Sequence, residues 1–310
     1  MLDSETVLTE LYVLIDEFCQ TQLPPDWRPG PAPALSRSET MTLVCFGQWG
    51  RFASERDFWR YAATPPRPLF PQLPHRTQFN RQARRHGAAI AAFATWLAGI
   101  LGAAAAPYEA VDATAVPTRT RKRRGRGWLA GPADQGWGGR LGWSHGFHLL
   151  LAVTPDGVVT GWGFGPASGN DRALAETRFA ARAGRLPGLP GAGRPARGAD
   201  AVDTGFAGIA GEARWLAEPD AQVVAAPQAN AASAAGWFPA WRRWLAGWRQ
   251  IVETVIGRLQ ATFRLDRERP HALDGFQARP AAKVGLHNAT IWLNRTRGRP
   301  HLAFADLLAW

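Results

Sequence analysis

After Pro107 the hydrophobic pattern of the chain changes from a helical period to short β-rich runs that alternate with helices. A hairpin turn at 155–157, with the sequence Pro-Asp-Gly, joins the second run to the third. The pattern predicts three strands followed by helices and strands in alternation. This order favours an α/β fold, a mixed sheet with helices on its faces. The β-rich runs are 108–112, 145–153, 158–164, 199–202 and 222–225.

The preceding third of the chain is typical of a series of helices with Pro-rich connections. Apolar residues at helical spacing predict a first helix through 8–19, and Ser36 with Glu39 forms the capping-box pattern that begins a second. Ser54 is suited to cap a third, short helix, and a longer helix is expected to begin near Thr77.

Residues 87–106 carry no charged side chain and are long enough to cross a bilayer. Most of them are Ala or Gly, however, and the large apolar residues among them recur every three or four positions. That spacing predicts a helix buried on one side rather than a membrane span. We therefore expect an all-α N-terminal domain over residues 1–106 and an α/β domain over residues 107–310.

The chain is strongly basic, with a formal net charge of +11 and a pI of about 11.0. This charge predicts a polyanionic partner, with nucleic acid as the first candidate and an anionic membrane surface as the second. Arginine carries nearly all of the charge, and its guanidinium matches two phosphate oxygens at once. Cys19 and Cys45 are too few for a disulfide framework and indicate a reducing compartment.

Two basic segments are candidates for DNA contact. Arg76 and Arg81 belong to a stretch, 58–106, that has six arginines and no acidic residue. Short helices that lead to a basic helix are typical of a helix-turn-helix-like DNA reader, although a plain bundle with a solvated basic face has the same pattern. The run 119–126 has six positive charges in eight residues and would grip phosphates, although it also fits a solvated loop. Its central residues are Arg121, Lys122, Arg123 and Arg124.

Three acidic side chains occupy positions at which separate elements can bring them together. Asp112 ends the first predicted strand, Asp203 follows the run 199–202, and Glu253 lies on the helix predicted over 248–263. Strand ends on one side of a sheet converge, and three carboxylates that meet repel one another unless cations lie between them. Mg²⁺ or Mn²⁺ suits such oxygen ligands, and a pair of these ions would activate a water or a 3′-hydroxyl for attack on a phosphodiester.

Neighbouring acids leave this assignment open. Glu109 lies on the first predicted strand, three residues before its final acid. Asp200 precedes the second aspartate of the set and would replace it if the strand register differed. Asp156 is typical of a turn residue and Asp171 of a helix cap.

The helix predicted over 248–263 has one apolar face and one polar edge. Arg249, Glu253 and Gln260 share the edge, where a helix packed on a sheet presents polar groups to a cleft. An ordinary amphipathic helix with an i,i+4 Arg–Glu pair has the same pattern. The residues of the apolar face, which we expect to be buried, are Val252, Val255, Ile256, Leu259 and Phe263.

Several short segments occur in an order that is informative as a set. They are 73–81, 111–117, 146–150, 166–167, 203–206 and 249–255. Together they resemble the corresponding parts of bacterial insertion-sequence transposases of the DDE type, whose catalytic domain is ribonuclease H-like. The resemblance covers roughly residues 70–260, and its specificity comes from the ordered set rather than from any one segment.

This resemblance implies that Asp112, Asp203 and Glu253 are the catalytic acids and the ligands of two Mg²⁺ or Mn²⁺ ions, and that Arg249 contacts DNA. It implies metal-dependent cleavage at the ends of a mobile element and strand transfer into target DNA. The implied partner is double-stranded DNA, both the terminal inverted repeats and the target, bound by a homodimer. The implied location is the cytoplasm, in association with the nucleoid and without a membrane partner.

The chain also departs from the family pattern at two places. Gln260 stands where many relatives have Lys or Arg, and the nearby Arg258 lies about 160° around the helix from it. After Pro227 the chain is neutral at 228–230, where relatives tend to be basic. Both departures remove phosphate contacts and favour an alternative, a catalytically inactive DNA-binding derivative. A further alternative is a ribonuclease H-like nuclease that cuts without strand transfer.

Overall fold

The computed structural model describes residues 1–26, 30–64, 69–120, 129, 131–138, 142–182, 198–218, 221–269 and 271–310. The chain divides into two compact units. The first unit consists of Met1–Leu97, Ala261–Leu265 and Ala272–Trp310, and the second of Ala98–Gln260 and Asp266–His271. The C-terminal segment therefore belongs with the N-terminal helices, whereas the division expected from the sequence assigned it to the second domain.

The first unit contains helices, two of which begin at the predicted caps Ser36 and Ser54. The Ser36 hydroxyl accepts from the Glu39 amide at 3.1 Å, and the Glu39 carboxylate accepts from the Ser36 amide at 2.6 Å, which confirms the predicted capping box. The long helix expected from Thr77 is two helices, which meet at His86. The helices in or entering this unit are α1 (Ser4–Gln22), α2 (Arg37–Phe46), α3 (Glu55–Ala62), α4 (Arg76–Arg85), α5 (Gly87–Ile100) and α9 (Leu273–Arg295).

Buried polar contacts tie the segment 261–265 into this helical unit. The ammonium of Lys283, on α9, donates to the Phe263 carbonyl at 2.6 Å and to the Gln48 side chain at 2.8 Å. The Gly50 amide donates to the Thr262 carbonyl at 2.7 Å. Phe263 is fully buried, as the periodicity of 248–263 predicted, although the helix itself ends at Ala261.

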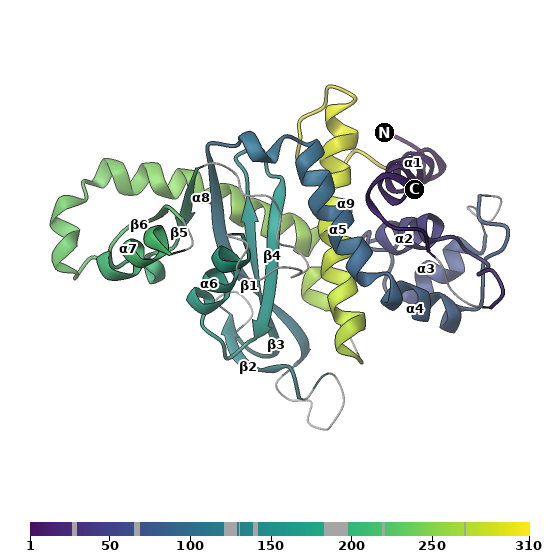
Figure 1. Ribbon diagram of the computed structural model, residues 1–310, viewed down its shortest axis with the longest axis horizontal. Helices are drawn as coiled ribbons and strands as arrows, with labels where there is room; N and C mark the ends of the chain where they lie inside the picture. Colours follow the sequence, from purple (N-terminus) through teal and green to yellow (C-terminus); the bar gives the residue numbers. More distant parts are fainter. Residues whose placement is uncertain are drawn as a thin grey trace. The chain divides into compact units, whose positions relative to one another are not determined.

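The second unit contains a curled mixed sheet flanked by helices (Figure 1). The strand order is β2-β3-β1-β5-β6, and β4 pairs with β3. The pairing of β1 with β5 and of β5 with β6 is parallel, and the other pairings are antiparallel. The strands are β1 (Tyr108–Thr120), β2 (Asp134–Gly138), β3 (Gly142–Val153), β4 (Val159–Pro166), β5 (Ala199–Val202) and β6 (Val223–Ala225). The helices are α6 (Asp171–Arg182), α7 (Ile209–Ala217), α8 (Pro239–Ala261) and the 3₁₀ turns η1 (Ala103–Ala105), η2 (Thr204–Phe206), η3 (Ala232–Gly236) and η4 (Leu265–Arg267), the last at the junction of the units.

Two strand predictions need correction. The first strand does not end at Asp112, because its pairing with β3 continues as far as Thr120 opposite Ser144. Strand β2 was not predicted, because its sequence, Asp-Gln-Gly-Trp-Gly, does not alternate between apolar and polar residues. The predicted hairpin is confirmed: Gly157 has a φ of +84°, and the Thr154 amide donates to the Val158 carbonyl at 3.0 Å.

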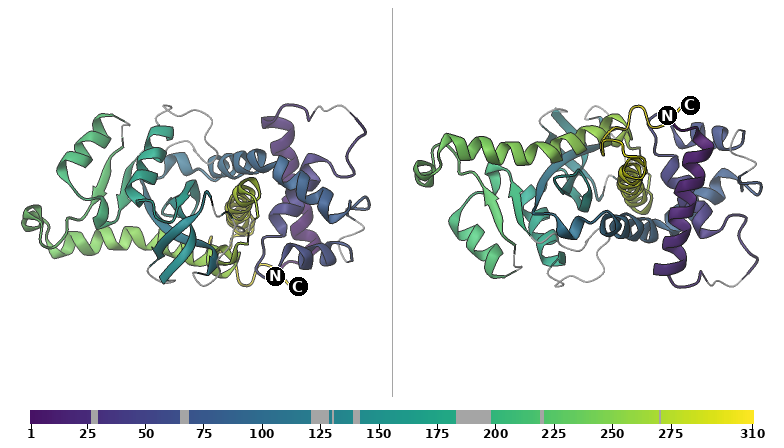
Figure 2. Two further views of the ribbon diagram at one scale, coloured as in Figure 1. Left: turned by 90° about the horizontal axis from the view of Figure 1, so that it is seen from below. Right: turned by 90° about the horizontal axis from the view of Figure 1, so that it is seen from above.

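The two faces of β1 and β5 carry different layers. Side chains alternate along a strand, so Val111 and Val202 lie in one apolar cluster with Phe179 of α6. Tyr108 and Ala201 lie on the other face, in a cluster with α8. Helices α6 and α8 consequently cover opposite faces of this part of the sheet (Figure 2).

The uncharged stretch 87–106 forms the 14-residue α5 and the short turn η1. Ile90, Phe93 and Leu97 are buried, whereas Ile100 is exposed, which agrees with the one-sided burial that the spacing predicted. Within the ranges that the structure describes, no helix is both long and apolar enough to cross a membrane.

Gly146 is a point of close backbone approach between β3 and β1. A Cβ there would lie 2.2 Å from the Val116 carbonyl oxygen, so the strands must separate if Gly146 becomes Ala. We expect Gly146→Ala to lower the free energy of unfolding by about 1–3 kcal/mol in chemical denaturation. Gly163→Ala, on β4, is the matched control, because no atom lies within 4 Å of the added carbon. Equal stability of the two variants would contradict this account.

Candidate active site

The first candidate acid lies in the middle of β1, on the face that α8 covers. Asp112 is half-buried, and its carboxylate accepts from the Ala113 amide at 2.9 Å. The neighbouring Tyr108 and Thr114 have the same strand parity and contact α8. The Tyr108 ring stacks on Trp248 at 4.0 Å between centroids, and Thr114 Oγ accepts from Gln260 at 3.0 Å. These contacts hold α8 beside the acid.

Asp203 is the residue that directly follows β5. It is the N-cap of η2, and its carboxylate accepts from the Thr204 amide at 2.6 Å. Strands β1 and β5 pair in parallel with Glu109 opposite Asp200. Asp112 and Asp203 each follow these paired residues by three positions, so the register brings the two aspartates to the same level of the sheet.

Arg249 of α8 joins the two aspartates. Its Nη2 atom lies 3.4 Å from Asp112 Oδ2, and its Nη1 atom lies 3.5 Å from Asp203 Oδ1. The guanidinium is largely buried, with 17% of the side chain exposed. Glu253 follows one helical turn later on α8 and is exposed to solvent.

The electrostatics of Asp112 link the three predicted acids. Burial raises the pKa of this carboxyl to about 6, although Arg249 and the Ala113 amide act in the opposite direction. The negative charges of Asp203 and Glu253 raise the pKa further. The charges of Asp203 and Glu253 are therefore close enough to act on Asp112.

The donor chemistry of this site suits a hard divalent cation, because all the candidate ligands are carboxylate oxygens. Burial disfavours the charged form of Asp112 and so raises its pKa, whereas a nearby cation would favour that charged form. In the described part of the chain, however, no three His, Cys, Asp or Glu side chains are grouped closely enough to hold a metal ion. The positive group between Asp112 and Asp203 in this structure is the guanidinium of Arg249.

The rival acids lie elsewhere. Glu109 and Asp200 are buried on the opposite face of the sheet, in ion pairs with arginines of α6. Asp156 lies in the β3–β4 hairpin turn, as predicted. Asp171 is the first residue of α6, and its carboxylate lies 2.8 Å from Nδ1 of His148, a contact that raises the pKa of this histidine. In the described part of the chain, the ion pairs of Arg249 are those with Asp112 and Asp203.

Gln260 does not lie on an open polar edge. Only 9% of it is exposed, because its amide donates to Thr114 within the packed contact between α8 and β1. A side chain in this position supports the helix rather than contacting phosphate. On the predicted apolar face, Val252, Val255 and Leu259 are buried, and Ile256 is partly buried.

The predicted DNA-binding arginines of the first unit differ in their surroundings. Arg76 lies 3.7 Å from the Glu55 carboxylate, which partly neutralises it. Arg81 is exposed on α4 and forms no ion pair within the described ranges. Asn80, which precedes it, donates to Glu55. The remaining predicted contacts, Arg121, Lys122, Arg123 and Arg124, lie outside the described residues.

The chain was compared with protein families, with curated sequences and with solved structures. No family model, no curated protein sequence and no solved structure matches the chain.

Replacing Asp112 by Asn tests the buried charge. Between the ordinary Asp pKa of 3.8 and the folded-state value of about 6, the folded protein binds more protons than the unfolded chain. The free energy of unfolding of the parent therefore falls as the pH rises through this window. We expect Asp112→Asn to match the parent below pH about 4 and to exceed it above pH about 6, by at most about 3 kcal/mol.

Chemical denaturation from pH about 4 to 8 measures this difference. Glu17→Gln, which removes an exposed carboxylate of α1, is the control. A difference between Asp112→Asn and the parent that stays constant with pH would contradict the assignment.

Proposed function

We propose that this protein is a DNA transposase of the DDE type, with a ribonuclease H-like catalytic domain formed by β1–β6, α6 and α8. The observation that carries the proposal is the single guanidinium of Arg249, which contacts both Asp112 and Asp203 one helical turn before Glu253. The reaction is cleavage of DNA at the ends of the mobile element, followed by strand transfer into target DNA. The protein would work as a homodimer on the nucleoid in the cytoplasm.

Each residue of the site has a distinct role in this proposal. Asp112, Asp203 and Glu253 would hold Mg²⁺ or Mn²⁺, which when bound supplies activation of the attacking hydroxyl and stabilisation of the leaving oxygen. Arg249 would bind a DNA phosphate, which its planar fork matches in two places. A phosphate that draws Arg249 away from Asp112 and Asp203 would leave these carboxylates without their cation. DNA binding would thereby favour metal binding.

The basic surface supports DNA as the partner. The net charge of +11 favours a polyanion, and Arg81 is an exposed cation on a helix of the first unit. The run 119–126, which begins at the end of the strand that carries Asp112, adds six positive charges. In the proposal these segments hold the terminal inverted repeats, while the three acids act on the scissile phosphate.

Cleavage assays test the acids directly. The substrate is duplex DNA taken from just outside the reading frame, where the terminal repeats of an insertion sequence lie. We expect Asp112→Asn and Glu253→Gln each to abolish Mg²⁺-dependent cleavage while DNA affinity falls less than about tenfold, because neither acid binds phosphate directly. Asp156→Asn, in the β3–β4 hairpin turn, should cleave as the parent does. Persistent cleavage by either active-site variant would refute the role of that acid.

A DNA-binding protein without catalytic activity is the second candidate. Two observations favour it: Asp112 and Asp203 pair with Arg249 and form no metal cluster within the described ranges, and Gln260 is a packing residue. Such a protein would bind the same duplexes and cut none. A ribonuclease H-like nuclease would cut them without joining the product to target DNA. Sequencing of the reaction products therefore separates the three functions.

Arg81 tests the DNA-binding role of α4. We expect Arg81→Ala to weaken binding and to reduce the slope of log affinity against log salt by about 0.9, the contribution of one phosphate contact. Arg81→Lys should keep the slope. Arg84→Ala, on the same helix, is the matched control and should change the slope less, since Arg84 lies 3.8 Å from the Asp274 carboxylate. Equal slopes for Arg81→Ala and the parent would remove Arg81 from the interface.

A further inference from the structure

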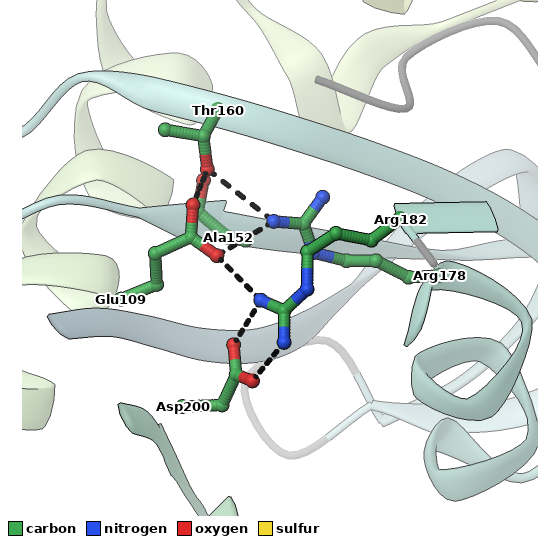
Figure 3. A network of polar contacts seen from close by, with 6 residues as sticks. All are labelled: Glu109, Ala152, Thr160, Arg178, Arg182 and Asp200. Atoms are coloured by element: carbon green, nitrogen blue, oxygen red, sulfur yellow. Dashed lines mark hydrogen bonds and ion pairs between the residues drawn. The ribbon is translucent and has the colours of Figure 1, made fainter. Parts of the chain in front are cut away.

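A buried network of charges lies on the face of the sheet opposite the candidate active site (Figure 3). Arg182 donates to Asp200 through two nitrogens, at 2.6 and 3.0 Å, and to Glu109 at 3.3 Å. Arg178 donates to Glu109 at 2.7 Å, and the Thr160 hydroxyl also donates to Glu109. At most 6% of any of the four charged side chains is exposed. Two positive and two negative groups are therefore buried together with balanced charge.

The two acids of the network are direct neighbours across the parallel pairing of β1 with β5. Glu109 lies opposite Asp200 in the register. Like charges directly opposite each other on adjacent strands repel, so this register would be unfavourable without a cation. Arg182 supplies that cation and contacts both acids with one guanidinium. The fork of Arg182 fits the two acids only when they lie side by side.

The other side chains of β5 add little that specifies this register. Strand β5 is four residues long, with the sequence Ala-Asp-Ala-Val. Its two alanine side chains are small, so their packing distinguishes poorly between alternative registers. A tight hairpin turn sets the register of β3 and β4, whereas β1 and β5 are far apart in the sequence. A shift of two residues would keep every side chain on its face but move β5 by about 7 Å. It would place Asp200 opposite an apolar residue, Pro107 or Val111, and separate it from Glu109.

The register also sets the position of the candidate catalytic aspartates. Asp112 and Asp203 each lie three residues beyond a member of the network, on the opposite face, where Arg249 contacts them. We infer that the network of Glu109, Arg178, Arg182 and Asp200 positions Asp112 opposite Asp203 by fixing the register of β1 against β5. Its residues touch none of the atoms that would react, so they are positioning residues. Their importance for catalysis rests on the proposed function, but their effect on the register does not.

The register can be measured without any enzymatic assay. Val111 and Val202 are neighbours in this register and belong to one buried cluster, so their methyl groups should give a nuclear Overhauser effect. We expect Arg182→Met, which leaves two facing carboxylates, to reduce this signal by more than half. Arg182→Lys keeps the charge but loses the fork and should give an intermediate loss. Arg214→Met is the matched control and should keep the full signal, because Arg214 pairs with Glu176 at the exposed surface.

A fourfold variant separates positioning from stability. It combines Glu109→Gln, Asp200→Asn, Arg178→Met and Arg182→Met, so that all four charges of the network are removed together. Because no unpaired charge is left buried, we expect this variant to fold even if Arg182→Met does not. We expect this variant to regain the melting temperature of the parent but not the Val111–Val202 signal. A full signal in the fourfold variant would overturn the inference, since apolar packing alone would then set the register.

The cleavage assay adds a second readout. We expect both Arg182→Met and the fourfold variant to lose at least about 100-fold in cleavage with DNA affinity unchanged, because the aspartates are displaced by far more than 1 Å. Recovery of cleavage together with stability in the fourfold variant would also overturn the inference. If the parent itself does not cleave DNA, the proposed function fails, and the methyl signal still decides whether the network sets the register.

Discussion

The parallel pairing of β1 with β5 is the contact on which the second unit depends. Only three residue pairs define it, from Tyr108 opposite Ala199 to Ala110 opposite Ala201. This short ladder nevertheless determines both faces of the sheet, because side chains alternate along each strand. On one face it brings Glu109 and Asp200 together below α6, and on the other it brings Asp112 and Asp203 together below α8.

The two pairs of acids differ in how their charge is balanced. Glu109 and Asp200 are excluded from water and are neutralised by two arginines. Asp112 and Asp203 share one arginine, at longer distances, and Glu253 adds a third negative charge nearby. A balanced buried network holds a structure together, whereas an excess of partly exposed negative charge is a place where a cation can bind. This contrast supports the proposal that one pair has a structural role and the other a catalytic one.

Helix α8 supplies Arg249 and Glu253 to the candidate active site. Its packing side chains and its polar side chains alternate, so Trp248, Val252 and Gln260 hold the helix in place while Arg249 reaches the aspartates. Gln260 shows that the position of a residue on a helix does not by itself reveal its role. A basic residue there would be read as a phosphate contact, but the close approach of α8 to Thr114 makes the position one of packing.

The sequence by itself determined the local features of this protein. Periodicity and caps predicted the capping box at Ser36, the hairpin at Gly157, the strand 199–202 and the burial of Val252, because the signal for each lies in neighbouring residues. It also singled out Asp112, Asp203 and Glu253, although it could not separate them from Glu109 and Asp200. Only the tertiary structure decided on which face of the sheet each of these acids lies, since that face depends on pairing between strands distant in the sequence. The same non-local pairing extended β1 past Asp112, added β2, and brought 272–310 into the helical unit.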